Sequence, residues 1–243
     1  MSRYRRSRYR SLATAPRNTW VKALRRGLAY GLLGFTLSSA AAVGILAAVP
    51  PPTTAFMLQR HVDDWLQNSR FRPIEQQWCA SRQISRHAFA AVIASEDQKF
   101  YRHSGFDTDA IRQAYQVYQR GGKLRGASTI SQQVAKNLFL TPARNAARKA
   151  LEVWFTMLIE TIWSKARILE VYLNVAEFGD HLFGIEAASR AYFGIPARQL
   201  SRSQAALLAA TLPNPLKLRA DNPSRYLLHR RDWILRQMTL ANS

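Results

Sequence analysis

Two adjacent acids, Glu96 and Asp97, stand at the end of an apolar segment that is typical of a helix, and aromatic residues, His103 and a glycine follow them. Catalytic acids and bases are often displayed where a rigid element meets a loop. The alternative is a surface pair that binds Lys99 and Arg102, and composition alone favours that alternative. Two further segments shift the balance towards chemistry.

The first of these segments concentrates amides and hydroxyls on one predicted helix. Its polar residues include Ser128, Thr129, Gln132, Gln133, Lys136 and Asn137. Gln132 with Lys136, and Gln133 with Asn137, are one helical turn apart and form neighbouring stripes. A solvated helix face more commonly mixes Glu and Lys. The composition therefore favours a surface that binds sugar hydroxyls and phosphate oxygens.

The second segment places cations around another glutamate. Arg148 and Lys149 precede Glu152 by four and three positions. Ordinary ion pairs within a helix have the same spacing and contribute about 0.2 to 0.5 kcal/mol each. Lys136 and Arg144 add further positive charge. Two separated glutamates and a cation cluster are together suited to glycosyl transfer from a diphosphate donor.

Four blocks of the sequence resemble, in order and spacing, the glycosyltransferase family-51 peptidoglycan polymerases, which include the glycosyltransferase domain of class A penicillin-binding proteins. The blocks are Glu96, Asp97, Phe100, His103 and Gly105; Gly126, Ser128, Thr129, Ile130, Gln132, Gln133, Lys136 and Asn137; Arg148, Lys149 and Glu152; and Lys165, Ile168, Glu170, Tyr172, Leu173 and Asn174. Later motifs extend the resemblance over roughly residues 55–240. It implies an all-α, lysozyme-like helical domain preceded by a single N-terminal transmembrane helix.

The resemblance also implies a reaction, the polymerisation of lipid II into β-1,4 glycan strands with inversion and release of undecaprenyl diphosphate. Glu96 is implied as the general base for the acceptor 4-hydroxyl, and Glu152 as a second essential glutamate. The implied substrate and diphosphate ligands are Lys136, Arg144, Arg148, Lys149, Ser128, Thr129, Gln132, Gln133 and Asn137. The supporting motif residues are Asp97, Phe100, His103, Gly105, Gly126, Glu170, Tyr172 and Asn174.

No organic cofactor is implied, and a divalent cation, Mg or Mn, at the diphosphate is left open. The sequence has no dedicated metal-ligand motif, its single cysteine excludes a thiolate cluster, and His103 is better explained as a structural residue. No lysine has a serine three positions before it, so the Ser-x-x-Lys motif of penicillin-binding transpeptidases is missing. We therefore expect a polymerase without crosslinking activity.

Helical periodicity dominates the elements that must position these residues. The predicted helices cover about 85–96, 107–120, 129–138, 145–163, 165–174, 184–193, 202–212 and 224–239. No convincing run of alternating strand residues is present, so we expect a predominantly α-helical domain. Residues 106–125 mix aromatic and basic side chains. An ordinary core-facing helix is the alternative there, but the resemblance places a membrane-facing jaw in this region.

The N-terminal segment combines basic residues with an apolar stretch. Residues 1–26 hold nine Lys and Arg and no acid, and residues 27–49 are uncharged. A helix of this length spans a hydrocarbon core of about 30 Å. A cleaved signal peptide is the alternative, but its apolar region is usually about 7 to 15 residues long and a proline run follows here. The positive-inside rule predicts a cytoplasmic tail (1–26), a signal anchor (27–49) and, after a Pro-rich linker (50–54), a domain (55–243) across the membrane, which in a bacterium means the periplasm or the cell surface. The resemblance implies the periplasmic side of the bacterial inner membrane.

The formal charge of +20 thus divides into two parts. The basic tail determines topology, and the 26 basic and 15 acidic residues of 50–243 belong to a domain that works beside anionic lipid and a diphosphate. The expected partners are lipid II, the growing glycan strand and the membrane, with no nucleic acid; cell-division or cell-wall synthase proteins are left open. A lytic enzyme of related fold and a noncatalytic anchored scaffold are the alternative functions, and the cation cluster with the Gln pair argues against the lytic one.

Overall fold

The computed structural model describes residues 17–67, 70–122, 128–143 and 145–240. The chain forms two compact units, residues 1–42 and 43–243. Helix α1 (Arg17–Leu46) accounts for the described part of the first unit and ends in the second. Its segment Thr19–Leu46 is long and apolar enough to cross a membrane, which is compatible with a membrane anchor.

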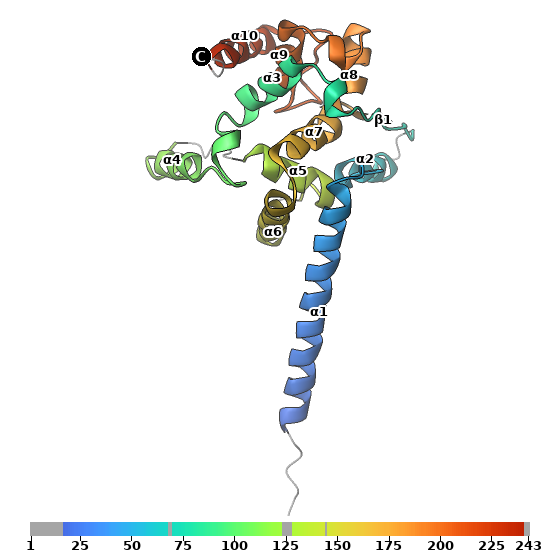
Figure 1. Cartoon of the computed structure of the whole chain (residues 1–243), viewed down its shortest axis with the longest axis vertical. Coiled ribbons are helices and arrows are strands. Elements are labelled where there is room, and N and C mark those ends of the chain that lie inside the picture. The colour runs from blue at the N-terminus through green and yellow to red at the C-terminus, as the bar shows by residue number, and fades with distance from the viewer. Residues whose placement is uncertain (1–16, 68–69, 123–127, 144, 241–243) are drawn as a thin grey trace, which may run out of the picture. The chain divides into compact units, whose positions relative to one another are not determined.

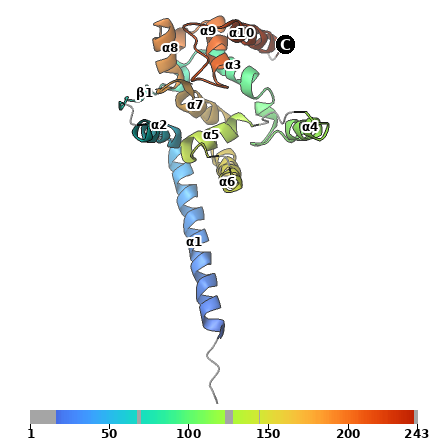
Figure 2. The ribbon, with the colours of Figure 1, turned by 180° about the vertical axis from the view of Figure 1, so that it is seen from behind.

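The second unit is mostly helical, which confirms the predicted fold class, and each of the eight helices expected there is present. Its helices are α2 (Ala55–Leu66), η1 (Ser81–Gln83), α3 (Arg86–Glu96), η2 (Phe100–Arg102), α4 (Thr108–Gln119), α5 (Ile130–Phe139), α6 (Ala146–Ile162), α7 (Lys165–Val175), α8 (Ile185–Phe193), η3 (Ala197–Gln199), α9 (Arg202–Thr211) and α10 (Arg225–Leu240). Helices α3, α9 and α10 pack together, and α5 packs against α2, α6 and α7 (Figures 1 and 2).

Side-chain caps explain where the site-bearing helices begin. The hydroxyl of Ser85 accepts from the His87 amide at the start of α3, and the carboxamide oxygen of Asn145 accepts from the Arg148 amide at the start of α6. Thr129 and Gln132 form a reciprocal capping box at the start of α5. The sequence indicated Ser85 and about Asn145 as two of these starts and left Ser128 or Thr129 open as the third, and the structure shows Thr129 as the cap.

The core lies around α5 and α7. Ile130 and Val134 of α5 and Ile168 and Leu173 of α7 are fully buried. Burial of this apolar surface is the main stabilising contribution of the two helices. It also fixes the polar face of α5 relative to the aromatic hydroxyl that α7 carries at Tyr172.

A small three-stranded sheet is present that the sequence did not predict. Its strands are β1 (Glu75–Gln76), β2 (Glu177–Gly179) and β3 (Leu182–Phe183), in the order β1-β3-β2. β1 is parallel to β3 and β2 is antiparallel to it. Strands of two or three residues are too short to show the alternation that identifies a strand in a sequence.

Candidate active site

Glu96 is the last residue of α3, and its side chain is only 13% exposed. Three donors contact its carboxylate. The hydroxyl of Ser95 donates to Oε1 at 2.8 Å, Nε2 of Gln133 donates to Oε2 at 3.1 Å, and Nη2 of Arg230 lies 3.5 Å from Oε1. All three are donors, which suits a carboxylate that acts as a base.

Gln133 is itself oriented from α7. The hydroxyl of Tyr172 donates to Oε1 of Gln133 at 3.2 Å. Burial raises the pKa of Tyr172 well above its usual value, so the phenol keeps its proton and remains a donor. Since Oε1 of Gln133 accepts from Tyr172, the amide nitrogen is directed at Glu96. The orientation of the amide thus follows from a residue that the sequence named only as supporting.

Asp97 holds the next turn of chain and does not compete for the role of base. Its carboxylate accepts from the Ile130 amide at 3.0 Å and contacts Nε2 of His103 at 2.9 and 3.0 Å. Nδ1 of His103 accepts from the Gly105 amide at 3.2 Å, which places the ring proton on Nε2. The carbonyl of Gly105 in turn accepts from the Thr129 hydroxyl at 2.6 Å. These contacts fix the end of α3 to the start of α5.

A cavity of about 310 Å³, which we call the cationic cavity, contains three members of the predicted cation cluster, Lys136, Arg148 and Lys149. It is lined by Phe56, Ser128, Gln132, Gln133, Lys136, Pro142, Arg148, Lys149 and Glu152. Glu152 is buried, and its two oxygens accept from Nη1 of Arg148 at 2.6 Å and from the Lys149 ammonium. Three cations therefore face one acid, which leaves excess positive charge in the cavity.

Two of these cations, Lys136 and Arg148, are available to bind an anion. Burial lowers the pKa of Lys136, and the nearby Glu152 opposes that effect. Nζ of Lys136 lies 5.2 Å from the ring centroid of Phe56 in α2. Nε of Arg148 is buried and has no hydrogen-bond partner within the described ranges. A buried donor of this kind is costly unless a ligand or water satisfies it.

The cavities adjoin one another through shared lining residues, and we call them together the groove. A cavity of about 300 Å³ beside Glu96 shares Ser128 with the cationic cavity. A third, of about 210 Å³, shares Phe56, Gln133 and Lys136 with it. The carboxylate of Glu96 and the cation cluster therefore lie along the same binding surface.

Several predicted ligands serve other purposes. The amide oxygen of Gln132 accepts from the Thr129 backbone, so both residues form the cap of α5 as well as lining the groove. Asn137 lines the third cavity, and its buried Oδ1 has no partner among the described residues. Arg144 and Gly126 lie outside the described residues.

The remaining motif residues support the helix that bears Glu96. Asn174 brackets the backbone of Cys79, accepting from its amide at 2.8 Å and donating to its carbonyl at 2.9 Å. Glu170 accepts from the Ser81 amide at 3.2 Å and from Arg167 at 2.7 Å. These contacts fix the segment just before α3. Phe100 supports the other end of α3, where it is fully buried.

Three residues in or next to the groove were not identified from the sequence. Ser95 and Arg230 contact Glu96, and Phe56 covers Lys136. Arg230 belongs to a predicted helix with adjacent arginines, but its partner is 134 positions away. Phe56 belongs to α2, a helix that the sequence did not predict. Only Ser95, next to Glu96, carried a local signal.

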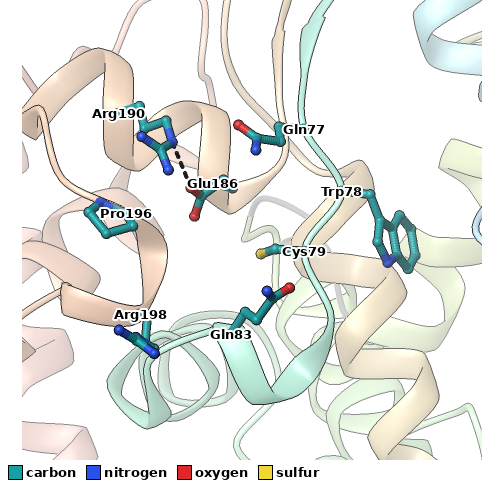
Figure 3. Close-up of a pocket in the computed structure, with 8 residues that line it drawn as sticks. All are labelled: Gln77, Trp78, Cys79, Gln83, Glu186, Arg190, Pro196 and Arg198. Carbon is teal, nitrogen blue, oxygen red and sulfur yellow. Dashed lines mark hydrogen bonds and ion pairs between the residues drawn. The ribbon is translucent and has the colours of Figure 1, made fainter.

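Another cavity, of about 320 Å³, is lined by Gln77, Trp78, Cys79, Gln83, Glu186, Arg190, Pro196 and Arg198 (Figure 3). It offers no comparable chemistry. Glu186 accepts from Arg190 at 2.6 Å and from the Ala197 amide at 2.7 Å, so both oxygens are engaged. Burial raises the pKa of the Cys79 thiol to about 12, which keeps it protonated and unreactive.

The residues around the groove do not form a metal site of their own. Within the described ranges, no group of three or more His, Cys, Asp or Glu side chains is arranged to hold a metal ion. Glu152 is the acid of the cationic cavity, and both of its oxygens are engaged by cations. A divalent cation would need most of its ligands from a bound diphosphate.

Comparison with known proteins agrees with the fold. The family model described as Transglycosylase matches residues 64–239. The chain is 52% identical over 219 residues to a biosynthetic peptidoglycan transglycosylase of Pseudomonas entomophila, covering 90% of this chain and 92% of that protein. It is 50% identical over 220 residues to the protein of the same name in Pseudomonas aeruginosa, covering 90% and 94%. The chain therefore belongs to the transglycosylase family and is a glycosyltransferase.

Proposed function

We propose that this protein is a peptidoglycan glycosyltransferase that polymerises lipid II into β-1,4 glycan strands with inversion and releases undecaprenyl diphosphate. The observation that carries the proposal is the groove that joins Glu96 to a cavity in which three cations outnumber Glu152. A base at one end and excess positive charge at the other are the requirements of transfer from a diphosphate. The names of the relatives support peptidoglycan as the product.

In the proposed step, the 4-hydroxyl of the acceptor lipid II attacks the anomeric carbon of the growing strand. Glu96 takes the hydroxyl proton as the new C–O bond forms. The bond from the anomeric carbon to the diphosphate breaks, and its electron pair leaves with the diphosphate oxygen. Lys136, Arg148 and Lys149 stabilise the charge that develops on this oxygen. Glu152 orients the last two cations, and Arg144 is proposed to add to them.

The contacts of Glu152 argue against the lytic alternative. A glycoside hydrolase of the common type needs one carboxylic acid that keeps its proton until it protonates the leaving group. Both oxygens of Glu152 accept hydrogen bonds from cations, so its carboxylate is engaged with Arg148 and Lys149 and not directed at a leaving group as a proton donor. A diphosphate needs no such protonation because it leaves as a stable anion. The groove is thus better suited to synthesis than to cleavage.

The location is also part of the proposal. We assign α1 as an uncleaved inner-membrane anchor with a cytoplasmic tail, and the second unit to the periplasm, from the charge asymmetry around the span. Helix α4 carries Ile111, Tyr115 and Tyr118 on one exposed stripe and has no buried residue. The stripe supports the membrane-facing jaw assigned to residues 106–125. Residues 123–127 lie outside the described part.

Purified full-length protein supplied with lipid II tests the proposal. We expect long glycan strands and released undecaprenyl diphosphate, with no shortening of preformed strands. Glu96→Gln should lower kcat by about 10² to 10⁴, because it removes the base. Glu186→Gln is the matched control, since its carboxylate lies in the separate cavity of Figure 3. Wild-type polymerisation by Glu96→Gln, or strand cleavage by the wild type, would refute the mechanism.

The same assay with a chelator addresses the divalent cation. We propose that no organic cofactor takes part and that the protein cations carry most of the leaving-group charge. Polymerisation should therefore persist in the chelator at a reduced or unchanged rate. Complete loss, restored by Mg or Mn, would show that a cation carried by the substrate is required.

A further inference from the structure

We infer that α2 is a second membrane contact, an amphipathic helix that lies in the headgroup region of the bilayer that α1 spans. The inference rests on the anchoring proposed above and is separate from the jaw at α4. The juxtaposition that carries it is an exposed apolar stripe on α2, directly after the span and in the same folded unit as its last turn.

The stripe follows helical spacing. Leu58, Val62, Trp65 and Leu66 lie at i, i+4, i+7 and i+8 and are 53, 44, 76 and 65% exposed. Phe71, just beyond the helix, is 66% exposed and stacks on His61 with ring centroids 4.8 Å apart. These five apolar residues, which we call the α2 stripe, are left exposed by the described part of the domain.

The other two faces of α2 are a buried face and a polar face. Met57 and Asp64 are buried against the domain. Gln59 and Asp63 form a polar face, on which Nε2 of Gln59 donates to Oδ1 of Asp63 at 2.8 Å. A helix with one face in the core, one in water and one apolar has the pattern of an interfacial helix. The apolar face is therefore not a core face that has lost its cover.

The end of the span is clamped to the domain that carries α2. Nε1 of Trp163 donates to the carbonyl of Val43 at 2.8 Å. The guanidinium of Arg167 donates to the carbonyls of Leu46 at 2.9 Å and Val49 at 2.8 Å. Eight residues separate the end of α1 from the start of α2. These contacts keep α2 near the point where the chain leaves the bilayer.

The residue types favour a bilayer as the occupant. Trp is enriched at the membrane–water interface, where its ring is apolar and its N–H can be hydrated. Arg70, exposed beside Phe71, suits anionic headgroups. The opposite end of α2 places Phe56 over Lys136 in the cationic cavity. If the substrate is the lipid-linked one proposed above, the contact holds the diphosphate site near the headgroups from which it would be drawn.

The test uses the full chain in vesicles of phosphatidylcholine and phosphatidylglycerol. A nitroxide is attached at Leu66→Cys in a Cys79→Ala background, and its collisions with oxygen and with a water-soluble nickel chelate are compared. Tyr226→Cys, 60% exposed on α10, is the matched control. We expect the ratio of oxygen to nickel collisions to be severalfold higher at position 66 than at position 226. A ratio equal to that at position 226 would overturn the inference.

Two further measurements distinguish failure of the proposed anchor from failure of the α2 contact. A nitroxide at Leu33→Cys, within the span, reports the anchor alone. A lipid signal there with an aqueous signal at position 66 keeps the anchor and rejects the α2 contact. A label at position 66 that neither oxygen nor nickel reaches would show that protein covers the stripe, which also rejects the inference. Trp65→Ser with Leu66→Ser should slow polymerisation in vesicles severalfold and leave the rate in detergent and the urea midpoint unchanged.

Discussion

Nε2 of Gln133 donates a hydrogen bond of 3.1 Å to Oε2 of Glu96, across two helices that meet only through tertiary packing. The other end of the amide accepts from Tyr172, so the contact has one orientation. The same Gln133 lines the cationic cavity. This residue therefore links the proposed base to the proposed leaving-group site and is the most informative position outside the charged residues.

Gln133→Ala should lower kcat by about 10- to 100-fold with a smaller effect on KM. A hydrogen bond to a charged group contributes about 1.5 to 3 kcal/mol, and about 1.4 kcal/mol corresponds to tenfold. Steady-state polymerisation with lipid II measures both constants. Thermal unfolding of the variant should remain close to that of the wild type, because Gln133 lies on the groove and not in the apolar core.

Tyr172→Phe should act through Gln133. It removes the donor that orients the amide and keeps the ring that fills the core, so we expect a severalfold loss of kcat. In a double-mutant cycle, Tyr172→Phe should cost little once Gln133 is alanine. Additive effects would mean that the tyrosine hydroxyl acts independently of the amide.

Arg230→Met should lower kcat about tenfold while KM changes by less than about twofold. The guanidinium donates to Ser95 at 3.1 Å and lies 3.5 Å from Glu96, so its loss leaves both partners less constrained. Arg230→Lys should recover part of the activity. The control is Arg231→Met, whose guanidinium pairs with Asp232 at 2.7 Å away from the groove. Equal losses in the two methionine variants would contradict a role specific to Arg230.

The lowered pKa of Lys136 predicts that substrate binding weakens at alkaline pH. Burial lowers the pKa of this lysine from 10.5, so the free enzyme loses its charge at a lower pH than an exposed lysine would. KM for lipid II should therefore rise as pH increases through the lowered pKa. Lys136→Arg keeps the charge, because arginine does not lose its proton in this range, and should move the rise to higher pH. The measurement is KM across alkaline pH in both proteins; identical profiles would exclude Lys136 as the titrating group.

The helices and their polar faces could be predicted from the sequence because their signals are local. Ser85, Thr129 and Asn145 each cap a helix through a residue two or three positions away. Arg230 could not be found in this way, because its contact with Glu96 depends on the packing of α10 against α3. The strands were too short to show a period. Helix α2 escaped prediction because apolar residues on two of its faces blur the single stripe of an ordinary amphipathic helix.

Substitution of Gly105 should reduce stability, because this residue has a positive φ and lies close to α6. Its φ is +89°, and a Cβ there would lie 2.8 Å from Cγ2 of Thr156 and 2.9 Å from Cγ of Glu160. Gly105→Ala therefore combines strain with overpacking and should lower the free energy of unfolding by about 3 kcal/mol. Gly121→Ala is the control, because Gly121 has a φ of +80° with no atom within 4 Å of such a Cβ, and it should cost only about 1 kcal/mol. Urea unfolding of both variants in detergent measures the difference. Equal losses would show that the space between Gly105 and α6 is not limiting, whereas the larger loss at Gly105 would confirm that α6 closely approaches the turn between η2 and α4.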